Sequence, residues 1–482
     1  MMATAPLTAE DLGRVHLIGV GGVGMSGLAR LLLTRGIATS GSELKDWPSL
    51  AGLRALGGTI HMRHDVSNLD GVDTVVYSSA IPADHLELVE ARARGLRVLH
   101  RSEALAAAMT GRQTIAVAGT HGKTTTTSML TAILQHGGLD PSFVIGGEIA
   151  EVGSNAHHGT GQYFVAEADE HDRSFLNYRP HVAIVTNIDA DHLNTYGDLA
   201  GLEDAFAEFC RLVGPGRPAG GSPGTAPQGF LVLCADDAAT RRLADRMRAE
   251  GLRVETYGEA EDAALRLTDL RSVGQSVRYL AFLDGKPLGE INLPVPGRHL
   301  GLNSAAAVLT AARLGLPTEQ IVDALAAFPG VRRRFELKGV ADAVRVYDEY
   351  AYHPTAMTAA LQTLRDVAGD GRLLVVFQPY RVYRTRDLRT EIAAALAIAD
   401  EAIVMEVFGP GETREPGDGG IALTATIALP PDRKVFVASW EDVAGEVCGR
   451  ARSGDVVVTM GAPPISLMGD ELLAALAARG RA

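Results

Sequence analysis

The stretch AGTHGKTTT at 118–126 places a lysine and a run of hydroxyls directly after a glycine turn. It follows an apolar run and precedes a helical pattern. A strand, a glycine turn, a lysine with a hydroxyl and then a helix form a triphosphate site. Backbone N–H groups bind the phosphates, the lysine neutralises their charge and a hydroxyl binds Mg²⁺. Val117 stands where the strict pattern has its first glycine, so the loop is a shortened variant. The sequence predicts a nucleoside-triphosphate site, and the alternative is a threonine-rich helix cap.

Polar residues directly follow two later apolar runs. They could supply the further oxygen ligands that a magnesium site at the phosphate loop needs. Glu167 ends the run 163–166, and a carboxylate there points into the crevice where ligands collect. The run 182–185 is followed by Asn187, Asp189, Asp191 and His192. Imidazole is softer than Mg²⁺ prefers. The residues alone therefore leave His192 open between a ligand and a capping or packing residue.

A second glycine turn, GVGGVG at 19–24, follows the apolar run VHLI. Gly19, Gly21 and Gly24 satisfy the GxGxxG pattern, and Glu43 lies downstream where a ribose-binding carboxylate would sit. The turn lets a backbone approach a diphosphate at a helix N-terminus. NAD, another nucleotide diphosphate, or a tight turn without a ligand would all suit it.

Composition and charge exclude several classes of protein. The 482 residues carry a formal charge of −13, which argues against nucleic acid or an anionic membrane as the main partner. The three cysteines lack CxxC spacing, so they form neither a zinc site nor a disulfide framework. The sequence shows no signal peptide and no apolar stretch of membrane-spanning length. We expect a cytoplasmic protein.

Short apolar runs alternate with longer amphipathic ones along the chain, for example VRVYDEY, RLLVVF and DVVVTMG near the end. This alternation is typical of parallel sheets with crossover helices, and the length suits about three domains. The segment 214–229 is rich in Gly, Pro and Ala, and we expect it to be a mobile surface loop. The basic run Arg332–Arg334 is either a solvated face or a phosphate contact made when domains close.

Taken in order, several motifs resemble the Mur ligase family. They are GVGGVGMSG, YSSAIP, AGTHGKTTT, EADE, TNIDADH, GRH…N, RRFE, YAYHPT, FQPYR and GDVVVTMGA. The resemblance implies an α/β fold with three domains: a Rossmann-like UDP-sugar domain at 1–107, a central mostly parallel P-loop ATPase domain at 108–331, and a Rossmann-like C-terminal domain at 332–482 that brings the amino acid. NAD binding is then discarded, because it leaves the loop at 119–124 and the C-terminal part unexplained.

Site roles follow from the resemblance position by position. It implies that Lys123, Glu167, His192, Arg334 and Asp348 are catalytic, and that Thr124, Glu167 and His192 hold Mg²⁺. The implied ATP contacts are Gly119, Thr120, His121, Gly122, Lys123, Thr124, Thr125, Asn303 and Arg334. Those implied for the UDP-sugar are Gly19, Gly21, Gly22, Gly24, Met25, Ser26, Ser42, Ser78 and Ser79. The amino-acid site candidates are Tyr350, Tyr352, Tyr380, Arg381 and Arg384.

The function that the resemblance implies is ATP-dependent joining of L-alanine to the lactyl carboxylate of UDP-N-acetylmuramate through an acyl phosphate, by a monomer or homodimer. At several motif positions this chain differs from the residues that are usual in the family. These positions are Leu300, Tyr352, Ala356, Tyr380, Pro463, Pro464 and His171. Leu300 would remove an adenine hydrogen bond. The C-terminal departures keep two alternatives open, a ligase that adds a different amine and a non-catalytic nucleotide-binding relative.

Overall fold

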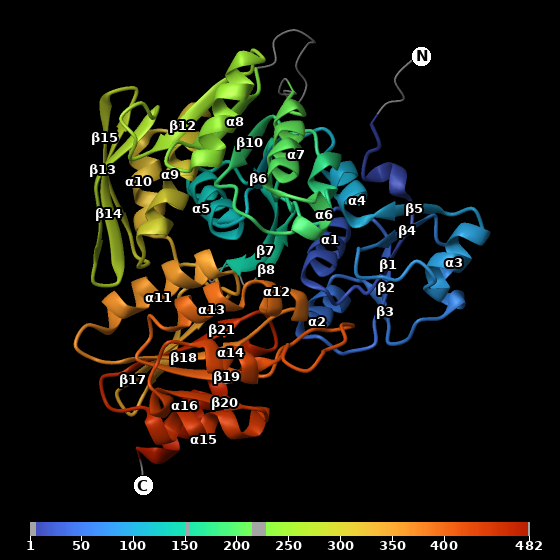
Figure 1. Cartoon of the computed structure of the whole chain (residues 1–482). Helices are drawn as coiled ribbons and strands as arrows, with labels where there is room; N and C mark the ends of the chain where they lie inside the picture. Colours follow the sequence, from blue (N-terminus) through green and yellow to red (C-terminus); the bar gives the residue numbers. More distant parts are fainter. Residues whose placement is uncertain (1–5, 150–153, 215–227, 481–482) are drawn as a thin grey trace. The chain divides into compact units, whose positions relative to one another are not determined.

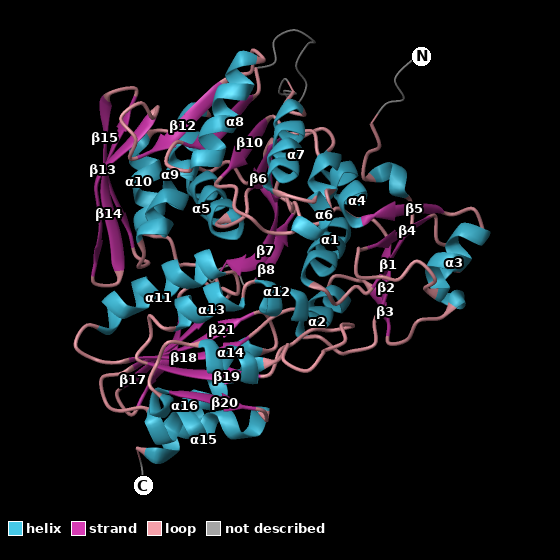
Figure 2. Cartoon of the chain, in the orientation of Figure 1, coloured by secondary structure: helices cyan, strands magenta, loops and turns pink. Residues whose placement is uncertain are grey.

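The computed structural model describes residues 6–149, 154–214 and 228–480 (Figure 1). Its strands form three sheets of five, ten and six strands, with helices in the connections between them (Figure 2). The chain divides into two compact units, 1–269 with 279–292 and 302–328, and 270–278 with 293–301 and 329–482. The α/β class with mostly parallel sheets is confirmed, and the three predicted domain boundaries stay a prediction.

The first sheet has the order β3-β2-β1-β4-β5 and is parallel throughout. Strand β1 is buried along its length, and Gly19, at φ +72°, turns the chain into the helix that follows. The strands are β1 Val15–Ile18, β2 Thr39–Ser42, β3 Thr59–His61, β4 Thr74–Tyr77 and β5 Arg97–His100. The helices are η1 Glu10–Leu12, α1 Val23–Thr34, α2 Pro48–Ala55, η2 Val66–Leu69, α3 Leu86–Ala93 and α4 Arg101–Met109.

The ten-stranded sheet has the order β15-β14-β13-β12-β11-β10-β6-β9-β7-β8. From β13 to β7 neighbouring strands run parallel, whereas β8 is antiparallel to β7. The strands are β6 Gln113–Ala118, β7 Ser142–Ile149, β8 Ser154–His157, β9 Tyr163–Glu167, β10 Val182–Val185, β11 Phe230–Cys234, β12 Val254–Gly258, β13 Leu265–Val273, β14 Ser276–Leu283 and β15 Lys286–Leu293. The helices are α5 Lys123–His136, η3 Ser174–Asn177, α6 Leu193–Tyr196, α7 Leu199–Arg211, α8 Ala238–Ala249, α9 Arg298–Arg313 and α10 Thr318–Ala326.

The C-terminal sheet has the order β16-β17-β21-β18-β19-β20 and is parallel except for the β16–β17 pair. Strands β18, β19 and β21 are buried along their length. The strands are β16 Glu336–Ala341, β17 Val344–Glu349, β18 Leu373–Gln378, β19 Glu401–Met405, β20 Lys434–Val437 and β21 Val456–Gly461. The helices are α11 Pro354–Ala368, α12 Val382–Asp387, α13 Arg389–Leu396, α14 Gly420–Thr426, η4 Pro431–Arg433, α15 Trp440–Arg450, η5 Ile465–Leu467 and α16 Met468–Arg479.

The predicted strand–turn–helix starts are confirmed: β1 leads into α1, β6 into α5 and β17 into α11. The loop predicted at 214–229 falls at 215–227 outside the described residues. None of the helices in the described ranges combines the length and apolar character that a bilayer crossing needs.

Candidate functional site

Two glycines give the phosphate loop its shape. Gly119 directly follows β6 at φ +125°, and a Cβ there would lie 2.1 Å from the Thr186 Oγ1. Gly122 precedes α5 at φ +84°, and a Cβ there would lie 2.4 Å from the Asn303 Oδ1. Both positions therefore require glycine for conformation and for space. The second contact also places predicted Asn303, on α9, beside the start of α5.

Residues that follow β10 hold the loop from behind. The Thr120 N–H donates to the Asn187 carbonyl oxygen at 3.0 Å, and the His121 N–H donates to the Asn187 Oδ1 at 2.9 Å. The Asp189 N–H donates to the Thr120 Oγ1 at 2.9 Å. Parallel strands β6 and β10 end at the same sheet edge, so their loops meet there. Asn187 and Asp189 thus position the loop.

Lys123 forms an ion pair with a residue that the sequence did not single out. The Lys123 Nζ lies 2.7 Å from the Glu170 Oε2 and donates to the Gly119 carbonyl oxygen at 2.7 Å. Glu170 is buried, and burial raises its pKa to about 7 against the opposing charge of Lys123. Burial lowers the pKa of Lys123, but the nearby carboxylates of Glu170, Asp169 and Glu167 together outweigh it and the net shift is upward. The signal for Glu170 was the EADE motif, whose second glutamate it is.

The predicted magnesium oxygens lie next to each other. The Thr124 Oγ1 donates to the Glu167 Oε1 at 2.9 Å, and the Glu167 Oε2 accepts from the Gly146 N–H at 2.6 Å. A hydroxyl at the start of α5 and a carboxylate at the end of β9 are the hard oxygen donors that Mg²⁺ prefers, so this pair fits the ion. The helix N-terminus adds a favourable site for phosphate.

His192 lies at the N-terminus of the short helix α6, at φ +54°. Its backbone N–H donates to the Asp191 Oδ1 at 2.8 Å, and its ring lies 5.9 Å from the His171 ring. The His171 Nδ1 in turn lies 3.2 Å from the Asp169 Oδ2. The His192 Nε2 also lies 3.6 Å from the Asp191 Oδ2. The role of His192 in metal binding stays a prediction.

The first glycine turn is covered by the segment after β2. The Glu43 Oε2 accepts from the Gly21 N–H at 3.0 Å. The Trp47 ring packs so closely that a Cβ at Gly21 would lie 2.1 Å from its Cδ1. Gly22 precedes α1 and its N–H donates to the Gly19 carbonyl oxygen at 3.3 Å. The carboxylate expected to bind a ribose thus lies beside the turn.

The remaining UDP-sugar candidates fall into two groups. Ser78 and Ser79 follow β4 at the carboxyl edge of the sheet, and the Ser79 Oγ donates to Asp172 and lies 3.2 Å from the His100 Nε2. Met25, Ser26 and Ser42 are buried instead. The Ser26 Oγ donates to the Val23 carbonyl oxygen at 3.1 Å, and the Ser42 Oγ donates to the Glu87 Oε2 at 2.6 Å. In this structure these three side chains stabilise the domain from inside.

Arg101, at the start of α4, was not predicted and lies beside the first glycine turn. A Cβ at Gly24 would lie 3.0 Å from its Nη1. A guanidinium beside a glycine turn is suited to pair with a diphosphate. We expect Arg101→Ala to raise the KM for the sugar nucleotide about tenfold or more, since a charge-assisted hydrogen bond contributes about 1.5–3 kcal/mol. Steady-state kinetics with each substrate varied in turn checks this. An unchanged KM for the sugar nucleotide, or an equal rise in that for ATP, contradicts it.

Arg334 and Asp348 belong to the C-terminal unit. Arg334 forms its ion pair with Glu349 and not with Asp348. The Arg334 Nη1 lies 3.6 Å from the Glu349 Oε1 and donates to the Tyr350 carbonyl oxygen at 3.2 Å. Glu349 also accepts from the Phe335 N–H at 2.9 Å. Asp348 is buried and accepts from the Thr459 Oγ1 at 2.7 Å. Glu349, next to the predicted Asp348, is therefore the partner that positions Arg334.

The amino-acid site candidates form one aromatic row in the same unit. Ring centroids lie 5.5 Å apart for Tyr350 and Tyr352, and 5.4 Å apart for Tyr352 and Tyr380. The Arg384 guanidinium lies 4.8 Å from the centre of the Tyr352 ring, and that of Arg381 lies 5.3 Å from the Tyr380 ring. These distances are within cation–π range. The structure brings together all five predicted residues.

The structure shows where two of the differences from the family's usual residues lie, at Leu300 and at the Pro463–Pro464 pair. Leu300 lies in the first turn of α9 and is buried, so its side chain serves packing. Pro463 and Pro464 lie between β21 and η5, where the Pro464 carbonyl oxygen accepts from the Leu467 N–H. The effect of Leu300 on ATP binding stays a prediction.

The buried Glu349 carboxyl should make the free energy of unfolding depend on pH. Burial raises the pKa of Glu349 to about 7 from 4.5, so between these values the folded chain binds a proton that the unfolded chain has lost. This carboxyl therefore lowers the free energy of unfolding by up to about 3 kcal/mol as pH rises from 4.5 to 7. Glu349→Gln should remove that term. Denaturant unfolding of both proteins without ligands, at pH 5 and pH 8, checks it, and parallel pH dependences would contradict it.

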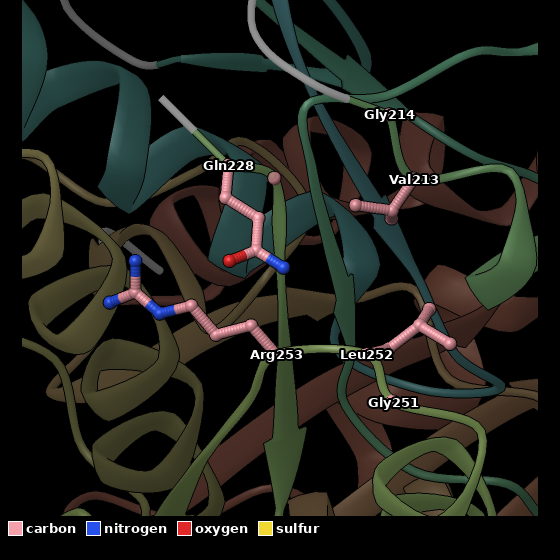
Figure 3. Close-up of a pocket in the computed structure, with 7 residues that line it drawn as sticks. Val213, Gly214, Gln228, Gly251, Leu252 and Arg253 are labelled. Atoms are coloured by element: carbon pink, nitrogen blue, oxygen red, sulfur yellow. The ribbon is translucent and has the colours of Figure 1, made fainter. Parts of the chain in front are cut away.

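A cavity of about 220 Å³ lies at the opposite edge of the central sheet (Figure 3). It is lined by Val213, Gly214, Gln228, Gly229, Gly251, Leu252 and Arg253. These residues precede β11 and β12, whereas the phosphate loop follows the carboxyl end of β6. Ligands of parallel sheets collect at the carboxyl ends. The cavity is therefore not part of the candidate site.

Comparison with known proteins agrees with this arrangement. Three family models match the chain: "Mur ligase family, catalytic domain" at 14–113, "Mur ligase middle domain" at 117–311 and "Mur ligase, glutamate ligase domain" at 333–463. The UDP-N-acetylmuramate–L-alanine ligase of Salinispora arenicola is 73% identical over 98% of this chain and 90% of its own length. That of Acidothermus cellulolyticus is 50% identical over 95% of this chain and 93% of its own length.

Solved structures show the same fold. The UDP-N-acetylmuramate–alanine ligase MurC of Thermotoga maritima superimposes with a TM-score of 0.79 at 26% identity, covering 96% of this chain and 98% of that one. The murein peptide ligase of Psychrobacter arcticus gives a TM-score of 0.70 at 25% identity, covering 96% and 99%. With a relative this similar over nearly its whole length, and a phosphate loop built as described, the chain belongs to the Mur ligase family.

Proposed function

We propose that this chain is an ATP-dependent ligase that joins L-alanine to the lactyl carboxylate of UDP-N-acetylmuramate, a step in the synthesis of peptidoglycan precursors. The observation that carries the proposal is the 73% identity to a UDP-N-acetylmuramate–L-alanine ligase over 98% of the chain. Lys123 at the glycine loop and the hydrogen-bonded pair of Thr124 and Glu167 support the proposal, because a triphosphate with Mg²⁺ needs a cation and hard oxygen ligands at such a loop.

The chemistry follows from what amide formation needs. A carboxylate is a poor acyl donor because its oxide is a poor leaving group. Transfer of the ATP γ-phosphoryl to the lactyl carboxylate gives an acyl phosphate and ADP. The neutral amine of L-alanine then attacks the carbonyl carbon, phosphate leaves, and the amine proton goes to solvent or base. Lys123 stabilises the charge of the transferring group. No nucleophilic side chain is required, so positioning supplies much of the rate.

Thr124 and Glu167 would hold Mg²⁺, with His192 as a further ligand. When bound, the ion neutralises phosphate charge and orients the γ-phosphoryl group. Glu167 meanwhile keeps the Thr124 hydroxyl oriented through its 2.9 Å hydrogen bond. The backbone carbonyl and the side-chain amide oxygen of Asn187 hold the loop in place by accepting from the Thr120 and His121 N–H groups. These residues therefore preorganise the site before the nucleotide arrives.

The proposed division of labour follows the predicted ranges. Residues 1–107 would bind the UDP-sugar at the turn 19–24, residues 108–331 would bind ATP, and residues 332–482 would supply Arg334 and the aromatic row for the amino acid. A chain that adds a different amine remains the second candidate. It is favoured by Tyr352 and Tyr380, which stand in the aromatic row where the family has histidines. The 73% identical relative favours L-alanine over that candidate.

An isotope experiment tests the proposal. The protein is incubated with ATP, L-alanine and UDP-N-acetylmuramate that carries ¹⁸O in its carboxylate. An acyl phosphate intermediate transfers one carboxylate oxygen to the released phosphate, so we expect labelled phosphate and an amide product in equal amounts. Unlabelled phosphate with amide formed would exclude the intermediate. Absence of amide would overturn the function.

A further inference from the structure

A buried carboxylate in the first sheet is surrounded by imidazoles that the proposed function does not use. Glu87, in the first turn of α3, is 0% exposed. His64 lies in the loop after β3, and His85 lies just before α3. One nitrogen or oxygen from each of these three residues lies within 4.8 Å of the other two. His16, on β1, is also fully buried, and its Nε2 lies 3.7 Å from the Glu87 Oε2.

Neighbouring donors fix the orientation of the Glu87 carboxylate. The Glu87 Oε1 accepts from the Asn68 Nδ2 at 2.7 Å and from the Asp65 N–H at 3.1 Å. The Oε2 accepts from the Ser42 Oγ at 2.6 Å. The group is therefore a fixed carboxylate, and such supporting contacts are typical of metal ligands.

Two imidazole nitrogens of the histidines around this carboxylate lack hydrogen bonds. Among the described residues, neither the His85 Nδ1 nor the His16 Nε2 has a hydrogen-bond partner, and both atoms are buried. Buried polar atoms without a partner are rare and require an explanation. A bound cation would satisfy these nitrogens.

We propose that His64, His85 and Glu87 bind a divalent transition-metal ion of the Zn²⁺ type, with His16 adjacent as a fourth ligand. Two imidazoles and one carboxylate favour such an ion over Mg²⁺. The His64 Nδ1 lies 3.4 Å from the Glu87 Oε2. Ligands bound at about 2.0–2.2 Å around a tetrahedral ion lie roughly 3.3–3.6 Å apart, so this pair already has the required separation.

Binding changes one contact and joins three elements. The His64 Nδ1 lies 2.9 Å from the Ser42 Oγ, and coordination through that nitrogen replaces this hydrogen bond. The ion would connect the loop after β3 to the start of α3, and β1 as well if His16 takes part. Ser42, at the end of β2, contacts both His64 and Glu87. The ion therefore stabilises the edge of the sheet next to the first glycine turn, independently of the proposed ligase activity.

Metal titration of the full-length protein tests this site. The protein is freed of metal with a chelator and titrated with Zn²⁺, and in parallel with Co²⁺ as a visible probe, in excess Mg²⁺ to occupy oxygen-rich sites. We compare wild type with His85→Asn and with the matched control His136→Asn, an exposed histidine in the last turn of α5. His85 is partly exposed, so Asn there should leave folding intact, and circular dichroism checks it.

We expect wild type and His136→Asn to bind a single Zn²⁺ with equal affinity and to gain thermal stability from it. His85→Asn should bind at least about tenfold more weakly and lose the gain. Co²⁺ should give the intense absorption of a tetrahedral site in the first two proteins alone. Equal binding in wild type and His85→Asn, or no Zn²⁺ binding in excess Mg²⁺, would overturn the proposal and leave Glu87 as the centre of a metal-free polar network.

Discussion

Replacing Lys123 by methionine is expected to lower kcat for amide formation by about 10³-fold or more. Its ammonium group is the cation placed at the phosphate loop, 2.7 Å from the Gly119 carbonyl oxygen. Groups that stabilise charge on a transferring phosphoryl group contribute about 10²–10⁵ in rate. Binding of UDP-N-acetylmuramate should not change, because the first glycine turn lies on another sheet. Coupled ADP release and calorimetric titration of the sugar nucleotide measure the two effects.

The ion pair with Glu170 complicates that experiment and also supplies its control. Methionine leaves Glu170 buried without its cation, and breaking a buried pair costs about 3–5 kcal/mol. Lys123→Met with Glu170→Gln removes both charges, so it should recover most of the lost stability and none of the activity. If Lys123→Met keeps more than a tenth of wild-type turnover, or if the double variant recovers activity, Lys123 does not have the role proposed here.

Replacing Glu167 by glutamine is expected to lower kcat by about 10²–10³-fold, the next largest effect. Glutamine can still accept from the Thr124 hydroxyl, but it loses the negative charge and one of the two acceptor oxygens. A neutral amide is a poor ligand for Mg²⁺ compared with a carboxylate. The Mg²⁺ concentration that gives half-maximal rate should rise. Initial rates over a range of Mg²⁺ at saturating substrates measure it.

Thr124→Val provides a matched change at the same hydrogen bond. It removes the hydroxyl and keeps the Glu167 charge, so we expect a smaller loss, about tenfold, and a smaller rise in the Mg²⁺ requirement. If Glu167→Gln has the same Mg²⁺ dependence as wild type, Glu167 only orients Thr124 and does not hold the ion. If Thr124→Val is the more damaging change, the order of importance proposed here is wrong.

The strand–turn–helix units could be predicted from the sequence because short apolar runs and glycines at their ends leave little choice of local structure. β1 begins and ends where the run VHLI does, and Lys123 starts α5 as the loop pattern requires. Adjacent carboxyl ends also follow from parallel strands, so Glu167 lies where it was expected, beside Thr124. Periodicity and turn chemistry are local, and local signals can be read from one chain.

Pairings between distant residues could not be predicted in this way. Glu170 for Lys123 and Glu349 for Arg334 depend on which side chain of an acidic stretch faces inward, and Arg101 beside Gly24 joins residues far apart in the chain. Burial of Ser42 against Glu87 likewise depends on the packing of α3 onto the sheet. The antiparallel β16 departs from the parallel pattern because it is a short hairpin partner of β17.

The measurement that tests the central claim most directly is a panel of amino acids and peptides in a coupled assay. Purified protein is given ATP and UDP-N-acetylmuramate, and each candidate amine is added singly while phosphate release and the mass of the product are followed. The account predicts strong stimulation by L-alanine, with one phosphate released per amide formed. Stimulation by another amine but not by L-alanine would contradict it, and would point to Tyr352 and Tyr380 as the residues that select the amine.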